Sequence, residues 1–307
     1  MPLPQRLCKD AKDMRHPRED LPMADKRQTP TVRLRRLAAE LRTLRTSSGL
    51  TRDAVVERTG INVATLYRIE HARVRPQTRT LRTLLDLYGA DEQQQADLVA
   101  LLRDARQRGW LHAYQSELPE QYTTYIGFEG EARSVWNYES LFIPGLLQTE
   151  DYARAVIRAV LPWASRDEVE RRVEVRMERQ DVLHNDNPLE LWVIMDEAAL
   201  RRQVGGRPVM QAQLGHLVEA ADLPNVTFQV IPFDVGAHAG MPGSFVFMQF
   251  GEAAIPDVVY IDSMAGDLFL EADADVRRYR LVFEHLRAVA VSPDESRSLV
   301  AALAAGM

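Results

Sequence analysis

The sequence predicts two domains of different class: an all-α N-terminal domain, then an α/β (α+β) domain built around a mixed sheet. Its 307 residues are enough for two separate hydrophobic cores. Apolar residues recur at helical spacing up to about residue 89, whereas beyond residue 120 strand-like runs alternate with helical ones. The charge also divides, because residues 1–90 carry 19 basic and 10 acidic side chains and the remaining 217 carry 19 and 34.

The chain begins with a segment that predicts no packed structure. Residues 1–30 are rich in charge and proline and lack apolar periodicity, which indicates a disordered tail. Met23 stands shortly before the first periodic segment, so the sequence leaves open whether translation starts at Met1 or Met23. The first helix follows, with leucines 34, 37, 41 and 44 on one face.

Two short helices joined by a glycine turn come next. Thr51 is expected to cap the first of them, and Gly60 permits the positive-φ turn that ends it. Asn62 is expected to cap the second, which runs to Glu70. Helices this short with so brief a connection favour a near-perpendicular pair over the hairpin of a helical bundle, which is the alternative. A basic loop and an amphipathic helix ending near Tyr88 complete this domain, and residues 90–119 are predicted to be a helical linker.

The second short helix has the side chains of a DNA-reading helix. Small or polar residues lie opposite its apolar side, and they allow close approach to base edges, while Arg68 can reach guanine O6 and N7. Arginines at helix and loop ends are placed for phosphate contacts, which suits the basic N-terminal charge. The predicted DNA-binding residues are Arg52, Asn62, Val63, Ala64, Thr65, Arg68, Arg73 and Arg75.

Residues 31–89 resemble the Xre (lambda-repressor-type) helix-turn-helix family. The matching positions are Leu50-Thr51, Gly60-Ile61, Ile69-Glu70, the loop 73–76 and the segment 81–88. The resemblance implies a structural salt bridge between Arg45 and Glu70. The chain departs from the family pattern at Arg52, Val56 and Ala72, where Gln, a small Ala and Gly are usual. One such module buries too little surface for tight binding, so we expect a homodimer on a palindromic double-stranded DNA operator.

The remaining chain predicts interleaved strands and helices. Apolar or alternating runs at 189–195, 226–233, 243–250 and 257–262 indicate strands, and a helix–strand–helix segment precedes them. A long charged helix is expected over 165–186, and two helices are expected near 273–290 and 293–304. Residues 120–307 are therefore assigned to one effector or partner-binding domain.

This second domain resembles that of actinobacterial regulators described as antitoxin-like. The matching segments are 129–132 (EGEA), 144–153 (PGLLQTEDYA), 197–200 (EAAL), 204–207 (VGGR), 213–217 (QLGHL) and the strand 225–232. The resemblance implies a transcriptional regulator whose second domain senses a ligand or binds a small cognate protein. The alternative is an antitoxin-like protein that sequesters that partner and autoregulates its operon.

The sequence gives little support for catalysis. All three lysines lie within the first 26 residues, and no histidine spacing is typical of a metal site, so we predict no catalytic residue, metal or cofactor. Asp196 is expected to be a helix N-cap. The order of elements near 189–262 loosely resembles a phospholipase-D-like half, but the lysine of that hydrolytic motif is missing. A hydrolase with a DNA-binding appendage is the third and weakest alternative.

Aromatic residues and one histidine suggest where an effector would bind. They either line an apolar pocket or pack in the core, and the sequence does not separate these. The predicted pocket residues are Trp136, Tyr138, Trp192 and His238. The single cysteine, Cys8, and the lack of a signal peptide or of a 20-residue apolar run predict a cytoplasmic protein that does not enter a membrane.

Overall fold

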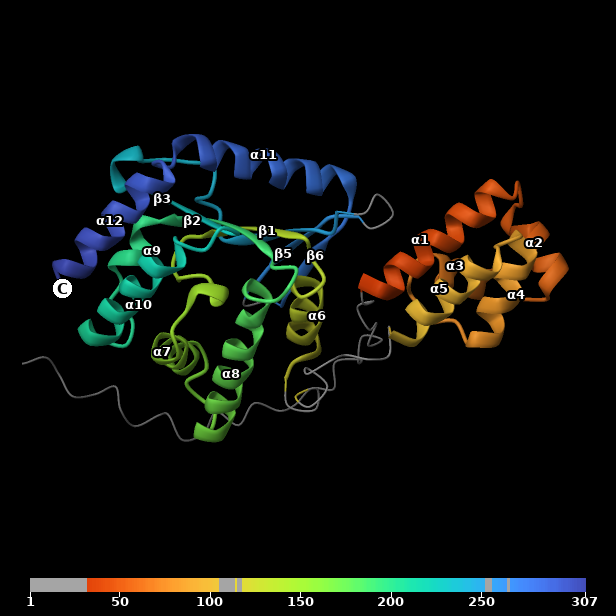
Figure 1. Ribbon diagram of the computed structural model, residues 1–307, viewed down its shortest axis with the longest axis horizontal. Helices are drawn as coiled ribbons and strands as arrows, with labels where there is room; N and C mark the ends of the chain where they lie inside the picture. The colour runs from red at the N-terminus through yellow and green to blue at the C-terminus, as the bar shows by residue number, and fades with distance from the viewer. Residues whose placement is uncertain (1–31, 105–113, 115–117, 252–255, 264–265) are drawn as a thin grey trace, which may run out of the picture.

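The computed structural model describes residues 32–104, 114, 118–251, 256–263 and 266–307 (Figure 1). Within these residues the chain forms a small helical N-terminal domain and a larger domain around a sheet. The predicted tail 1–30, with Met1, Cys8 and Met23, lies outside the described residues, as does most of the segment between 105 and 117.

The N-terminal domain is a compact set of helices. They are α1 (Val32–Ser47), α2 (Arg52–Thr59), α3 (Val63–Glu70), α4 (Thr78–Tyr88) and α5 (Glu92–Asp104). Leucines of α1 and α4 meet Leu66 and Ile69 of α3 in one buried cluster, as the helical periodicity predicts. Leu98, Val99 and Leu102 of α5 belong to the same cluster. The packed unit therefore extends past the predicted boundary at residue 89, because the apolar face of α5 covers α1 and α4.

The C-terminal domain contains a mixed sheet, as predicted. Its strands are β1 (Ser134–Glu139), β2 (Glu190–Asp196), β3 (Val226–Ile231), β4 (Phe245–Gln249), β5 (Val258–Ile261) and β6 (Leu268–Leu270), in the order β3-β2-β1-β4-β5-β6. The first three strands run parallel, and the β1–β4, β4–β5 and β5–β6 pairs are antiparallel. The strand β6 is not predicted by the sequence, since its three residues are too few to show an alternating pattern.

Helices cover both faces of the sheet (Figure 1). The larger core lies beneath α6 (Glu120–Glu129), α7 (Glu150–Val160), α8 (Arg166–Glu178), α10 (Arg207–Ala220) and α12 (Pro293–Ala305). A second core lies beneath α11 (Asp273–Val289). The short helices α9 (Glu197–Arg201), η2 (Gly145–Leu147), η3 (Arg179–Leu183) and η4 (Phe233–Val235) complete the described connections.

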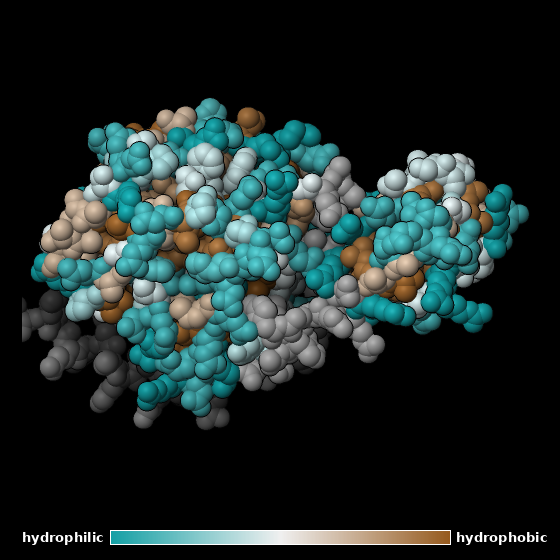
Figure 2. All heavy atoms as spheres, in the orientation of Figure 1, coloured by the Kyte–Doolittle hydropathy of each residue, from teal (hydrophilic) through white to brown (hydrophobic). Residues whose placement is uncertain are grey.

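The charged helix predicted over 165–186 is shorter than expected. The α-helical part ends at Glu178, and a 3₁₀ helix continues to Leu183. At this break Arg179 turns inward, where its Nε lies 2.7 Å from the buried Glu129 carboxylate. Figure 2 shows the outer side of α8 as a largely hydrophilic surface, in keeping with its sequence RDEVERRVEVRME.

Side chains of α1 join the two domains. Arg35 is buried, and the guanidinium carbon lies 4.4 Å from the centroid of the Phe128 ring in α6. Its Nη1 lies 2.5 Å from a carboxylate oxygen of Glu271, which follows β6. Arg33 pairs with Glu131 at 3.1 Å. The N-terminal domain therefore adjoins the C-terminal domain at the side of α6 and β6 (Figures 1 and 2).

Candidate nucleic-acid interface

The ends of α2 and α3 are fixed by the residues that the sequence singles out. The Thr51 hydroxyl accepts a hydrogen bond from the Ala54 N–H at 3.3 Å, and the Asn62 side chain accepts one from the Ala64 N–H at 2.9 Å. Gly60 ends α2 with a φ of 71°. These three positions confirm the predicted caps and the glycine turn, which together set the angle at which α3 leaves α2.

Ala72 also adopts the left-handed conformation. Its φ is 54°, and no other non-glycine residue in the described part of the chain has a positive φ. The methyl group costs about 1–2 kcal/mol in this region of backbone space. Glycine would adopt this conformation without that cost.

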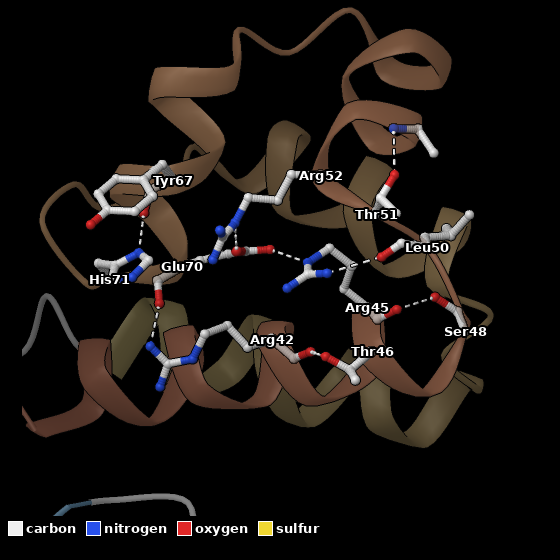
Figure 3. Close-up of polar contacts among 11 residues, drawn as sticks. Arg42, Arg45, Thr46, Ser48, Leu50, Thr51, Arg52, Tyr67, Glu70 and His71 are labelled. Carbon is white, nitrogen blue, oxygen red and sulfur yellow. Dashed lines mark hydrogen bonds and ion pairs between the residues drawn. The ribbon is translucent and has the colours of Figure 1, made fainter. Parts of the chain in front are cut away.

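Glu70 holds α3 against α1 and α2 (Figure 3). Its carboxylate has no exposed surface and accepts hydrogen bonds from the Nε atoms of Arg45 and Arg52, both at 2.6 Å. Arg42 donates to the Glu70 backbone carbonyl at 2.7 Å, and Arg45 also donates to the Leu50 carbonyl at 2.9 Å. The Arg45–Glu70 pair implied by the resemblance is present, and Arg52 extends it to a third helix.

Two arginines expected at phosphates have partners within the chain. Arg52 pairs with Glu70, as above, with 37% of its side chain still exposed. The guanidinium of Arg75 donates to the backbone carbonyl of Leu102, near the end of α5. Arg73 is exposed, and its guanidinium carbon lies 5.7 Å from the centroid of the Tyr67 ring. Whether any of the three contacts phosphate remains a prediction.

The outward face of α3 carries the predicted base-reading residues. Val63, Ala64 and Arg68 are exposed, and Thr65 is partly exposed. The Arg68 Nε donates to the Ala64 carbonyl at 3.2 Å, and an Nη lies 3.4 Å from the Thr65 hydroxyl. Arg68 therefore lies along its own helix, where its guanidinium makes two long contacts.

Tyr67 is a residue on this face that the sequence analysis did not single out. Its side chain is 38% exposed, and its ring stacks on His71 with 3.9 Å between ring centroids (Figure 3). Tyr67 follows Val63 by four residues, and this helical spacing places both side chains on one face. The sequence alone does not show that Tyr67 is exposed, because an aromatic residue in a short helix is more often part of a core.

The aromatic residues proposed for an effector pocket lie in a packed layer. Trp136 stacks on Phe247 and Phe283, with centroids 5.4 and 5.0 Å away, and Tyr138 is fully buried. The Trp192 indole donates to the Gln229 side chain at 3.0 Å. These contacts lie between the sheet and α11, and they match the core alternative more closely than an open pocket.

His238 is held between two partners. Its Nε2 lies 3.2 Å from the Asp196 carboxylate, and the Gly240 N–H donates to its Nδ1 at 3.2 Å. The N–H of the neutral ring is therefore on Nε2, where it donates to Asp196. Asp196 also accepts the Ala198 N–H at 2.8 Å, as the predicted N-cap of α9. With both ring nitrogens bonded, His238 fastens the loop after η4 to the end of β2.

A carboxylate with an altered affinity for protons lies at the end of β1. Burial is the main cause that raises the pKa of Glu139 to about 7; the Ser244 hydroxyl and Arg176 lower it, and the neighbouring Asp262 adds to the rise. No group of His, Cys, Asp and Glu side chains among the described residues is arranged to hold a metal ion. No helix in the described part of the chain is long and apolar enough to span a bilayer.

The paired helices α2 and α3, with the exposed polar face of α3, define a helix-turn-helix domain. The family model described as a helix-turn-helix domain matches residues 36–98, which supports a DNA-binding regulator. A domain of unknown function (DUF5753) matches residues 122–302, more than half of the chain, and the chain belongs to that family. No curated protein and no solved structure matches the chain.

Proposed function

We propose that this protein is a sequence-specific, Xre-type transcriptional regulator that binds a palindromic operator as a homodimer. The observation that carries the proposal is the fixed presentation of α3. Glu70 and its arginines hold the inner side of the helix, and Arg68 lies exposed on the outer side. A rigid helix with a guanidinium on its outer face has the chemistry to read a guanine in the major groove.

In this proposal the C-terminal domain regulates DNA binding, as in the antitoxin-like group. It senses a ligand or binds a small cognate protein, catalyses no reaction and needs no cofactor. A chain of contacts supports this proposal. Arg33 and Arg35 connect the C-terminal domain to α1, and α1 connects to α3 through Glu70. A change at α6 or β6 would alter the position of one recognition helix in the dimer. The protein is proposed to act on DNA in the cytoplasm.

The test of DNA reading compares two arginine variants. A preferred sequence is selected from random duplexes with the intact protein, and its affinity is measured by fluorescence anisotropy at fixed salt. Arg68→Ala is expected to weaken binding by about 1–3 kcal/mol and to relax one base position. Arg278→Ala, which removes an exposed charge from α11, is the control and should leave the preference unchanged. An unchanged preference in Arg68→Ala would contradict the proposed orientation of α3.

The alternative is that the C-terminal domain sequesters a small protein and that DNA binding only autoregulates the pair. Purification from the native host distinguishes the two. A stoichiometric small protein whose activity is blocked in the complex favours sequestration. A retained small molecule that changes operator affinity favours sensing.

A further inference from the structure

The outer face of α3 is apolar as well as basic. Val63 and Tyr67 are 48% and 38% exposed, and they are the exposed large apolar side chains of the described N-terminal domain. Together with Ala64 and Arg68 they line a shallow depression on the surface. We call Val63, Ala64 and Tyr67 the apolar strip of α3.

Several contacts hold the ring of Tyr67 in the apolar strip. The Tyr67 ring stacks on His71, whose Nδ1 in turn lies 2.7 Å from the Tyr67 backbone carbonyl (Figure 3). Guanidiniums of Arg52 and Arg73 lie 5.5 and 5.7 Å from the ring centroid. A ring held in this way loses little conformational freedom on binding, so contact with it favours affinity.

The charges around the apolar strip indicate what kind of surface would bind it. Arg52, Arg68 and Arg73 surround it, and such a setting favours a polyanion that also presents an apolar group. The major groove of DNA is such a surface, and its apolar group is the C5 methyl of thymine. Residues four apart on a helix have Cβ atoms about 5–6 Å apart, and successive bases rise by about 3.4 Å. The strip therefore extends over roughly two base steps.

Resting on the proposed function, we propose that the apolar strip reads thymine methyl groups, so that the operator half-site carries thymines next to the base that Arg68 contacts. Arg68 would supply the polar part of the recognition. Val63 and Tyr67 would exclude water from the methyl groups and would disfavour cytosine at the same positions.

The experiment replaces each thymine of the selected half-site by deoxyuridine, which removes the methyl group and nothing else. At one or two positions the affinity of the intact protein is expected to fall about fourfold, the effect of exposing one methyl group. In Val63→Ala or Tyr67→Ala the loss at the contacted position should disappear, whereas Tyr67→Phe should keep it. Val160→Ala, an equal change at a 53% exposed valine of α7, is the control and should also keep it.

Three results would overturn the inference. If binding stays selective and Arg68→Ala still weakens it, but no deoxyuridine has an effect, the strip does not read methyl groups and the proposed function stands. If the strip variants change only the oligomeric state, the strip is a protein interface. If the intact protein selects no sequence at all, the proposed function fails too. Because Val63 lies outside the core, its variant is expected to fold.

Discussion

Glu70 is a carboxylate without exposed surface, and its charge is balanced by two guanidiniums at 2.6 Å. Removing a carboxylate from water costs several kcal/mol, and only close partners offset that cost. Burial of the Tyr88 hydroxyl, together with the nearby charge of Glu70, raises the pKa of Tyr88 to about 12. The buried charge of Glu70 is therefore stabilised by its ion pairs with Arg45 and Arg52.

Glu70→Ala is expected to lower the free energy of unfolding of the N-terminal domain by about 3–5 kcal/mol, because it leaves Arg45 with no carboxylate partner beside the core. Hydrogen exchange of peptides from α2 and α3 measures the change. Glu57→Ala, at an exposed position of α2, is the control and should cost under about 1 kcal/mol. Equal protection in the two variants would show that Glu70 does not stabilise the domain.

Single residues differ in how well the sequence predicts them. The caps Thr51 and Asn62 and the turn at Gly60 are set by their own backbone, so local sequence is sufficient. The partners of Arg52 and Arg75 are not set by local sequence. Arg52 bonds to a residue 18 positions later, and Arg75 to one 27 positions later. A charge pattern alone cannot tell such an arginine from one that faces phosphate.

At the scale of elements, the ends of β1, β4 and β5 bring polar residues together at one end of the sheet. Glu139 lies there at the end of β1, with Ser244, Asp262 and Arg176 around it. Its pKa in the folded state is about 7, above the ordinary 4.5 of the unfolded chain. The folded state thus prefers the protonated carboxyl. The stabilising contribution is full below pH 4.5 and is lost as the pH rises through 7.

Glu139→Gln is expected to stabilise the C-terminal domain by roughly 1–3 kcal/mol at pH 8 and to change little at pH 5, because the amide carries no charge and keeps an acceptor for Ser244. Denaturation followed by tryptophan fluorescence measures both values, since Trp136 and Trp192 lie in this domain. Glu219→Gln, at an exposed position of α10, should leave the pH dependence as it is. A pH dependence that survives in Glu139→Gln would assign it to another group.

Helices and strands whose apolar residues repeat regularly are predicted well from the sequence, whereas the points at which a helix ends early are not. The strands β2 to β5 and the helices α11 and α12 lie within a few residues of the predicted ranges, because their apolar residues repeat along the segment. Where α8 ends at Glu178, the next residue, Arg179, contacts Glu129, 50 residues earlier, and local sequence does not show such a contact. The placement of α5 in the N-terminal core likewise depends on contacts between helices.

At the scale of the whole molecule, the described residues form two packed units, which meet through side chains of α1. The change from helical to strand-like patterns after about residue 120 predicts two units, but the N-terminal core extends past the predicted boundary at residue 89. The contact itself is not predictable, because Arg35 is one of many arginines and meets Phe128 only after both domains have folded. The route from the C-terminal domain to α3 then runs through α1, whose Arg42 and Arg45 both bond to Glu70.

Arg35→Ala is therefore expected to loosen the two domains from each other while leaving each folded, because it removes the cation–π contact with Phe128 and the pair with Glu271. Spin labels at Ser48→Cys and Ser298→Cys, in a protein that also carries Cys8→Ser, report the distance between the domains. The distribution of distances between the two labels should broaden in Arg35→Ala. It should stay narrow in the control Arg58→Ala, which removes an exposed charge from α2. Equal distributions would show that Arg35 does not couple the domains, and the C-terminal domain would then have to act on α3 by another route, such as dimer spacing.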